Sequence, residues 1–298
     1  MQVAANIKTF ERPEKFRKTL EHALDAGIKE INIGFDGSSK YLEKHKVIVD
    51  NVKENHKDAS IEFYKFRYNK GLSYVRNRLI EKTDAELIFQ LDDDIYISKH
   101  NLESVGIFKE TKLEEIGGVG FGWITPFNID IDAHNINIKD GWYLRDVTGG
   151  DRRLEWKGHF YILPFDFIPT SGIYKKELFD DVKYDENYII NREHEDFFLQ
   201  IKTQNLKWKF MIDVSSYVFH DIGGSDEYME KRHGKLGKKS SEYFNKKWGL
   251  KGILGNPWEL SKYLDRKAYS MYAYSDYIQK VHGVDSNTVD KSWLFWQQ

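Results

Sequence analysis

The chain has 298 residues, and its 45 Lys and Arg against 47 Asp and Glu give a formal net charge of −2 at pH 7. Because polyanion binders normally carry a basic excess, this balance argues against a general nucleic-acid binder. Cysteine is absent, which excludes disulfides and cysteine-based metal sites or nucleophiles. No apolar run approaches the ~18 residues of a membrane helix, and the N-terminus lacks the apolar centre of a signal peptide, so we expect a cytoplasmic protein.

The N-terminal part of the chain alternates between strand and helix patterns. Short apolar or alternating runs predict strands over residues 3–7, 30–35, 61–66 and 87–91. Apolar residues at helical spacing predict helices from Pro13 to Gly27, over residues 41–55, and after Gly71. Apolar strands that alternate with helices are typical of a parallel sheet covered on both faces, which binds ligands at the carboxyl ends of its strands. Asp36 and the segment Asp92 to Asp94, which follow the second and fourth strands, are therefore expected to share one site.

The pattern changes after residue 116. Strands are predicted over residues 117–124, 167–174 and 215–220, and a helix over residues 195–202. Residues 125–165 are rich in Asn, Asp, Gly and aromatic residues, which indicates loops and short antiparallel strands. Residues 226–298 favour helices and end in an aromatic tail. The second part of the chain is thus expected to complete a mixed sheet rather than continue the regular alternation.

Three acidic residues, Asp92-Asp93-Asp94, directly follow the apolar run 87–91. While extended geometry persists, Asp92 and Asp94 project to one side and Asp93 to the other. Two carboxylates on one side repel each other unless a cation lies near them, and a hard divalent ion bridging a diphosphate would meet that need. A solvated acidic turn is the non-functional alternative, but the buried run before it favours a metal site.

A second acidic segment, Glu193-His194-Glu195-Asp196, begins the helix predicted downstream. Transfer of a group to a hydroxyl needs a base, and a carboxylate within hydrogen-bond reach can serve. Acids are also favoured at helix N-termini by the helix dipole, which is the structural alternative. His220 ends the strand over residues 215–220, where an imidazole can ligate a metal ion or simply be structural.

Groups that could hold a nucleotide follow the second and third predicted strands. The Asp36 carboxylate could accept hydrogen bonds from a base or a ribose hydroxyl, and Asn69 and Arg76 lie near the same sheet edge, where arginine suits a phosphate or a nucleobase. A solvated helix face is the alternative for Arg76. The chain has neither a GxxxxGK[ST] loop nor a GxGxxG motif after its first strand, so phosphate charge must be met by a metal ion and side chains.

Taken in order, these segments resemble the family 2 glycosyltransferases of the GT-A fold. The segments that carry the resemblance are Thr9 to Pro13, Asp36-Gly37-Ser38, Asn69-Lys70-Gly71 with Arg76-Asn77, Leu91 to Asp94, Ser171-Gly172, Glu195-Asp196 and His220. The resemblance implies an α/β fold with a Rossmann-like, mainly parallel mixed sheet flanked by helices. It covers residues 1–222, which we take as the transferase domain, with residues 223–298 as a helical extension packing on the core.

The resemblance implies an inverting transfer from a nucleoside diphosphate sugar, with a UDP-sugar favoured, to a hydroxyl of a glycan, glycolipid, protein or other acceptor. Asp94 and His220 would hold Mn²⁺ or Mg²⁺, and Asp92 would contact the ribose, or the metal through water. Beside Asp92, the donor nucleotide would be bound by Thr9, Asp36, Asn69, Arg76 and Asp93.

The resemblance also assigns the chemistry of the transfer. Asp196 would deprotonate the acceptor, and Glu195 would bind the acceptor or the donor sugar, with Glu195 as the alternative base. Ser171 and Gly172 would lie beneath the donor sugar.

Two other classes of function remain open at this point. A nucleotidyltransferase on a related sheet would also use acids and Mg²⁺, but it normally carries a Gly-rich loop after the first strand, where this chain has Thr9 to Pro13. A non-catalytic carbohydrate-binding protein could use tryptophans as sugar platforms, namely Trp123, Trp142, Trp156 and Trp258. That interpretation gives the acidic segments no reason to converge.

Overall fold

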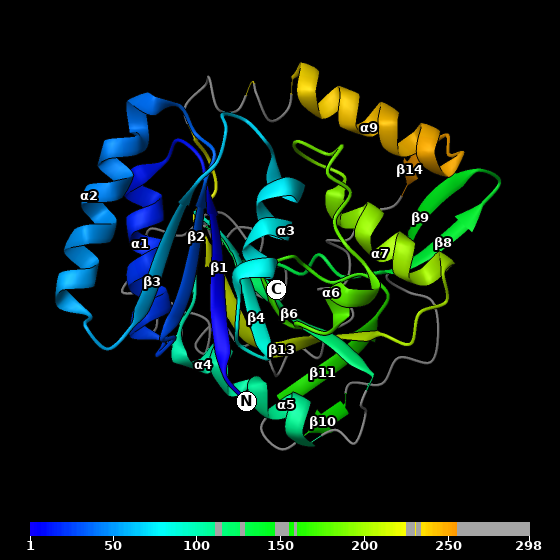
Figure 1. Cartoon of the computed structure of the whole chain (residues 1–298). Coiled ribbons are helices and arrows are strands. Elements are labelled where there is room, and N and C mark those ends of the chain that lie inside the picture. The colour runs from blue at the N-terminus through cyan, green and yellow to red at the C-terminus, as the bar shows by residue number, and fades with distance from the viewer. Residues whose placement is uncertain are drawn as a thin grey trace, which may run out of the picture.

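The computed structural model describes residues 1–110, 115–125, 129–146, 155–157, 160–224, 230 and 234–254. These residues form one large sheet flanked by helices, with a small second sheet at its side (Figure 1). The strand order of the large sheet is β10-β11-β13-β6-β12-β4-β1-β2-β3, with β5 paired to β13 and β7 paired to β6. The small sheet has the order β14-β9-β8.

The first half of the large sheet is built from consecutive strand–helix units, as predicted. Its elements are β1 (Val3–Thr9), α1 (Pro13–Asp25), β2 (Glu30–Phe35), α2 (Ser39–Asn55), β3 (Ser60–Lys65), α3 (Leu72–Lys82) and β4 (Leu87–Asp92). The four strands are parallel to their neighbours in the order β4-β1-β2-β3. Pro13 stands in the first turn of α1, where its missing N–H costs nothing, and Phe16 and Leu20 bury one face of that helix.

The second half combines elements from distant parts of the chain. They are β5 (Ile95–Tyr96), α4 (Lys99–Glu103), α5 (Val105–Glu110), β6 (Ile116–Ile124), β7 (Ile129–Asp130), β8 (Asn135–Lys139), β9 (Trp142–Asp146), β10 (Glu155–Lys157), β11 (Phe160–Phe165), β12 (Gly172–Lys175), α6 (Leu178–Asp181), α7 (Glu193–Thr203), β13 (Lys209–His220), α9 (Lys235–Trp248) and β14 (Gly252–Leu254). The strand predicted over residues 167–174 is shorter than expected, whereas β13 begins six residues before the predicted strand.

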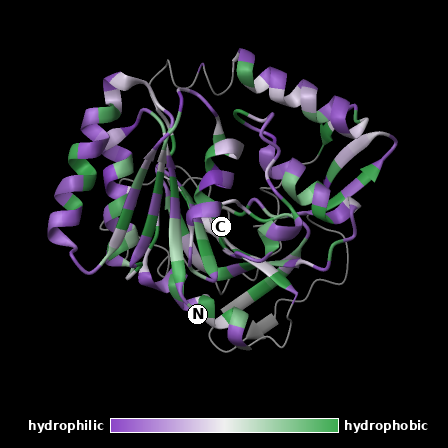
Figure 2. Cartoon of the chain, viewed as in Figure 1, coloured by the Kyte–Doolittle hydropathy of each residue, from purple (hydrophilic) through white to green (hydrophobic). Residues whose placement is uncertain are grey.

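The hydrophobic core forms two clusters, one on each face of the large sheet. Neighbouring residues of β4 alternate between them, with Phe89 in the cluster under α1 and Ile88 in the cluster under α6 and α7. Apolar segments accordingly concentrate in the central strands, while the outer helices α1 and α2 alternate between polar and apolar positions (Figure 2). In the part of the chain that the structure covers, no helix is long and apolar enough to cross a bilayer.

The chain beyond residue 222 is joined to the core by α9 and β14. Phe244 of α9 is fully buried in the cluster under α7, and β14 pairs in parallel with β9. The segment after residue 222 therefore contributes a strand as well as a helix. The division into domains at residue 222 stays a prediction, and residues 255–298, including Trp258, lie outside the described ranges, as does the side chain of Trp156.

Candidate functional site

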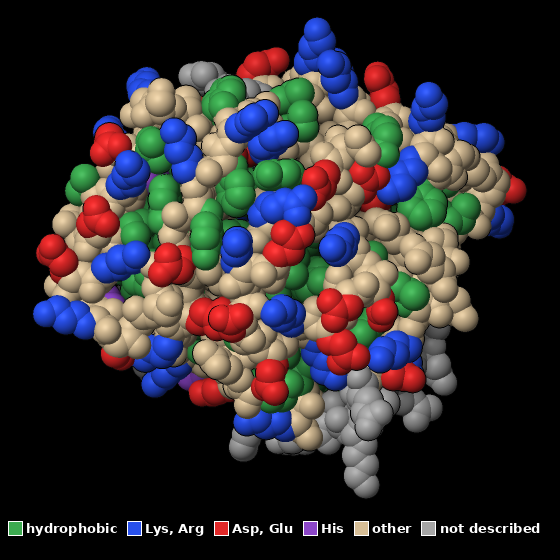
Figure 3. Space-filling view, in the orientation of Figure 1, with side chains coloured by type: hydrophobic (Ala, Val, Ile, Leu, Met, Phe, Trp, Pro, Cys, Tyr) green, Lys and Arg blue, Asp and Glu red, His purple; other side chains and the backbone are tan. Residues whose placement is uncertain are grey.

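The ends of five strands converge at one edge of the large sheet. β1, β2 and β4 are parallel, β6 and β13 are parallel, and β12 lies between β4 and β6, antiparallel to both. The carboxyl ends of these five strands therefore share an edge with the start of β12. A cavity of about 480 Å³ opens there and extends from Asp36 beyond β2 to Asp132 beyond β7. Acidic and basic side chains are interspersed over the molecular face in Figure 3, which fits the near-zero net charge.

The three consecutive acids at the end of β4 do not follow strand geometry, because β4 ends at Asp92 and the next two residues form a turn. The Arg12 guanidinium binds both Asp93 and Asp94, the latter at 2.6 Å. Asp92 instead accepts a hydrogen bond of 2.7 Å from Arg76. The expectation that Asp92 and Asp94 project to the same side is therefore wrong. Asp93 and Asp94 instead share the Arg12 guanidinium.

Asp94 and His220 lie side by side although 125 residues separate them along the chain. The antiparallel pairing of β5 with β13 places His220 opposite Ile95, and His220 Nε2 lies 3.6 Å from Asp94 Oδ2. Burial opposes ionisation of Asp94, but Arg12 and His220 outweigh it and hold the pKa of that carboxyl well below its usual range. The sequence thus predicted this spatial neighbourhood correctly.

The donor atoms of Asp94 and His220 fit part of a metal site. No group of three or more His, Asp and Glu side chains is arranged for metal binding within the described segments. One carboxylate oxygen of Asp94 and one imidazole nitrogen of His220 nevertheless lie 3.6 Å apart at the cavity wall, and the second ring nitrogen of His220 has no hydrogen-bond partner among these residues. Mg²⁺ is usually held by one or two carboxylates together with waters and substrate phosphates, so this pair suits a cation that arrives with a diphosphate.

Asp36 fixes the turn that begins α3. Its Oδ2 accepts a hydrogen bond of 2.8 Å from the Gly71 amide, and Lys8 Nζ forms an ion pair with its Oδ1 at 3.0 Å. Gly71 has φ +95°, and a Cβ there would lie 2.5 Å from the Cα of Ile189, so only glycine fits. Asn69 also has a positive φ, of 52°. Asp36 and Asn69 both line the cavity, which agrees with the predicted nucleotide end.

Thr9 and Arg76 differ from prediction, because neither lines the cavity. Thr9 is fully buried and donates a hydrogen bond of 2.8 Å to Asp93. Arg76 is 2% exposed and lies between Asp92 and Glu193, which it contacts at 2.7 and 3.2 Å. Both residues therefore position the cavity's carboxylates rather than face a ligand.

Glu195 and Asp196 are neighbours in sequence with opposite surroundings. Glu195 lines the cavity, and its Oε1 accepts hydrogen bonds from Arg145 at 2.8 Å and from Arg192 at 2.6 Å. Although burial opposes ionisation, these two arginines lower the pKa of Glu195 to about 2. Such a carboxylate remains charged and is a weak proton acceptor.

Asp196, predicted as the base, does not line the cavity. It is fully buried on the opposite side of α7 and accepts hydrogen bonds from Tyr188, Gln200, Lys247 and Trp248 at 2.8 to 3.1 Å. These contacts join α7 to α9. The physical reason for the misassignment is helical geometry, since consecutive residues of a helix point in directions about 100° apart.

Ser171 and Gly172 also separate. Ser171 lines the cavity, whereas Gly172 does not. A Cβ at Gly172 would lie 2.7 Å from the Val119 carbonyl oxygen, so this glycine permits close pairing of β12 with β6. Of the predicted site residues, the cavity contains Asp36, Asn69, Asp92, Asp93, Asp94, Ser171, Glu195 and His220.

The cavity also contains residues that were not predicted as site residues, namely Arg12, Asp132, Arg145, Arg192 and His194. The position of Arg12 could have been predicted from the sequence. Arg12 lies between β1 and Pro13, and β1 is adjacent to β4, which leads into the three aspartates. Asp132 and Arg145 come from the segment 125–165, whose periodicity is too weak to place any side chain. Arg192 has a left-handed backbone with φ 68°, a conformation that no sequence pattern announced.

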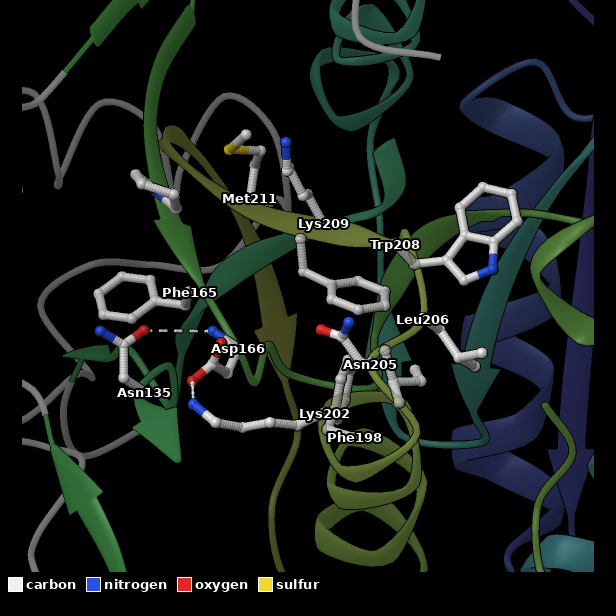
Figure 4. Close-up of a pocket in the computed structure, with 13 residues that line it drawn as sticks. Asn135, Phe165, Asp166, Phe198, Lys202, Asn205, Leu206, Trp208, Lys209 and Met211 are labelled. Atoms are coloured by element: carbon white, nitrogen blue, oxygen red, sulfur yellow. Dashed lines mark hydrogen bonds and ion pairs between the residues drawn. The ribbon is translucent and has the colours of Figure 1, made fainter. Parts of the chain in front are cut away.

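A second cavity, of about 580 Å³, lies at the opposite end of β13. Its wall is mainly apolar, with Phe165, Trp208 and Met211, and Lys202 points to the Asp166 carboxylate in an ion pair of 2.5 Å (Figure 4). Its other lysine, Lys209, pairs with Glu115. Because the strand-edge cavity gathers His220 and the carboxylates at the strand ends, we place the functional site there.

Comparisons with known proteins bear on the fold and on the family that the chain resembles. Residues 6–108 match the family model described as glycosyl transferase family 2. S. aureus TarS 1–349 matches with a TM-score of 0.50 and 12% identity over 93% of this chain and 74% of that one. The same protein in complex with UDP-GlcNAc matches with a TM-score of 0.51 and 12% identity over 94% and 82%. The chain spans 43% of the longer S. aureus TarS structure, and no curated protein sequence matches it.

The structural matches show the fold, which is GT-A-like as predicted. The segment from residue 6 to residue 108, which carries β1 to β4 and the three aspartates, is similar to the glycosyl transferase family 2 model.

Proposed function

We propose that this protein transfers a sugar from a nucleoside diphosphate sugar, with a UDP-sugar favoured, to a hydroxyl acceptor, with inversion at the anomeric carbon. The observation that carries the proposal is the meeting of Asp94 and His220 at the carboxyl end of β4, within a family 2 segment. The match to TarS in complex with UDP-GlcNAc supports the choice of donor.

The nucleotide would bind at the Asp36 end of the cavity. Lys8, Phe10 and Asn69 line this end, and Lys8 Nζ lies 4.9 Å from the centre of the Phe10 ring. An aromatic face beside a cation offers a stacking surface for a base and a positive charge for a phosphate. Because Gly71 and Asp36 hold the Asn69 turn in place, this end is preorganised before the donor arrives.

The diphosphate would lie near Asp94, where Asp94 and His220 would hold Mn²⁺ or Mg²⁺. The bound cation would neutralise charge on the departing diphosphate. Arg12, which binds Asp93 and Asp94, would then be available to contact a phosphate oxygen. Arg76 would keep Asp92 oriented at the cavity wall, with 33% of the Asp92 side chain exposed.

The sugar would lie between Ser171 and Glu195. Glu195 is held by two arginines and stays ionised, so it can accept hydrogen bonds from sugar hydroxyls throughout the neutral pH range. Its low pKa makes it unsuitable for taking a proton from the acceptor.

Thermal unfolding with UDP, with GDP and with UTP, each with and without Mn²⁺, tests this function. Stabilisation of about 2.7 kcal/mol is expected at 100 times the dissociation constant of UDP, and only when Mn²⁺ is present. Asp94→Ala is expected to abolish this metal-linked gain, while Asp50→Ala, an exposed position on α2, should retain it. A preference for UTP with pyrophosphate release would favour a nucleotidyltransferase, and no response to any nucleotide would favour a carbohydrate-binding protein.

A further inference from the structure

We infer that Asp132 is the general base that takes the proton from the acceptor hydroxyl. This inference rests on the proposed sugar transfer and names a residue for a step that the placement of Asp196 leaves open. Asp132 lies between β7 and β8, in the segment that sequence analysis could not interpret.

The position of Asp132 is at the acceptor end of the cavity. β7 pairs antiparallel with the last residues of β6, so the chain at Asp132 lies on the β6 and β13 side of the edge. Asp36 and the proposed nucleotide end lie beyond β2, on the other side of Asp94. Asp132 lines the same cavity as Ser171 and Glu195, which would contact the sugar. An acceptor entering from this side would therefore meet Asp132 near the sugar.

Asp132 differs from the other described cavity acids in its ion pairs, because Asp36 pairs with Lys8 and Glu193 with Arg76, whereas no Lys or Arg among the described residues pairs with Asp132. Asp92, Asp93, Asp94 and Glu195 each contact at least one arginine. The Oδ1 atom of Asp132 is buried and has no hydrogen-bond partner among the described residues, and 19% of its side chain is exposed. A buried polar atom without a partner costs free energy, and such atoms recur where a ligand supplies the missing contact. An acceptor hydroxyl donating to this carboxylate would supply it.

The charged groups around Asp132 tune it for proton transfer. Burial raises the pKa of Asp132, Arg145 on β9 lowers it and the charge of Glu195 on α7 raises it, and together they leave it at about 6. The ring of His134 lies at 4.0 Å, beyond hydrogen-bond distance. A base is most effective when its pKa is near the working pH, and two carboxyls with pKa values pushed apart in one cavity indicate different roles. Glu195 and Asp132 form such a pair.

The proposed transfer forms one covalent bond to the sugar and breaks one. The acceptor oxygen forms a bond to the anomeric carbon of the donor sugar, and the bond from that carbon to the diphosphate oxygen breaks, with its electron pair leaving on the diphosphate. The acceptor hydroxyl proton moves to the Asp132 carboxylate and is later lost to water. No oxidant or further reactant is needed.

Asp132→Asn tests the inference against Asp140→Asn, an exposed aspartate in the turn between β8 and β9. The donor is the UDP-sugar that gives the fastest release of UDP in a panel of UDP-sugars and glycan acceptors with Mn²⁺. We expect Asp132→Asn to slow transfer by about 100-fold or more and Asp140→Asn to leave it unchanged. UDP with Mn²⁺ should stabilise both variants as it stabilises the unchanged protein.

The pH profile separates a base from a structural residue. For the unchanged protein, kcat/KM should rise as the pH increases through about 6 and then level, because the ionised carboxylate is the active form. Asp132→Asn should lose this rise, and Asp132→Glu should restore part of the rate. Because its raised pKa means that ionised Asp132 opposes folding, Asp132→Asn should unfold at the same or a higher temperature at pH 7.5.

Two results would overturn the inference. Transfer by Asp132→Asn within threefold of the unchanged protein would reject Asp132 as the base while leaving sugar transfer intact. Absence of both UDP-linked stabilisation and UDP release in the unchanged protein would reject the proposed function and this inference with it.

Discussion

The two halves of the large sheet satisfy their acidic side chains in different ways. In the first half, β4 ends in three aspartates that Arg12 and Arg76 hold from neighbouring elements. In the second half, Asp132 faces the same cavity with one oxygen lacking a partner among the described residues. The three aspartates of the first half are held in ion pairs, whereas Asp132, whose pKa is about 6, can gain or lose a proton near neutral pH. In the proposed reaction, the first half holds the nucleotide, and the second half contacts the metal ion and the sugar and moves the proton.

The largest effect on the free energy of unfolding should come from removing the Arg76 guanidinium, which is buried in the first half of the sheet. Arg76→Met would leave Asp92 and Glu193 without their partner in a buried setting, which should lower the free energy of unfolding by about 3–5 kcal/mol. Arg78→Met on the same helix removes ion pairs to Glu81 and Glu186 at the surface and should cost about 1 kcal/mol or less. Urea unfolding at pH 7 measures both variants, and equal losses would break the distinction between fixed and exposed charges.

The next effect concerns Glu195, a charged group that acts on Asp132 from α7. Its lowered pKa contributes stability above its ordinary pKa, and this contribution is lost as the pH falls toward about 2. Glu195→Gln should therefore cost about 3 kcal/mol at pH 7, and the gap from the unchanged protein should shrink by more than half by about pH 3. Urea unfolding at a series of pH values measures the gap, and Glu54→Gln, exposed on α2, serves as the control. A gap independent of pH would contradict the arginine clamp.

The smallest of these effects sharpens the assignment of the base. Asp196→Asn weakens contacts with Lys247 and Trp248, but burial also raises the pKa of Asp196, so removing its charge should change stability by only about 1 kcal/mol or less. The rate of transfer per folded molecule should stay within threefold, because Asp196 does not reach the cavity. Asp180→Asn, exposed on α6, should change neither quantity. A loss of 100-fold in transfer with UDP binding intact would return the role of base to Asp196.

The sequence was most informative where structure is local. The strands and helices up to β4 were predicted within a few residues, because apolar periodicity and Pro or Gly boundaries act over short distances. The meeting of Asp94 with His220 was also predictable, since both follow strands whose carboxyl ends share an edge. The same reasoning placed Asp36 and Asn69 correctly.

The remaining site depended on information that the pattern does not contain. The side chains of Thr9, Arg76 and Asp196 point toward partners that are distant in the chain. No short-range pattern shows this direction, so each was predicted to face the ligand, whereas none of them lines the cavity. Asp132 and Arg145 lie on irregular or short-stranded segments, where no period fixes the direction of a side chain. The left-handed backbone of Asn191 and Arg192 is likewise set by tertiary contacts.

The contacts of Asp196 with Lys247 and Trp248 bear on where this protein can be shortened. A fragment ending at residue 222 would retain the segment that matches the family 2 model, but it would lose Leu236 from the cavity wall, remove Lys247 and Trp248 as donors to Asp196, and expose the apolar residues that pack against Phe244. The smallest piece that can stand alone therefore extends at least to Leu254, where β14 closes the small sheet behind Arg145.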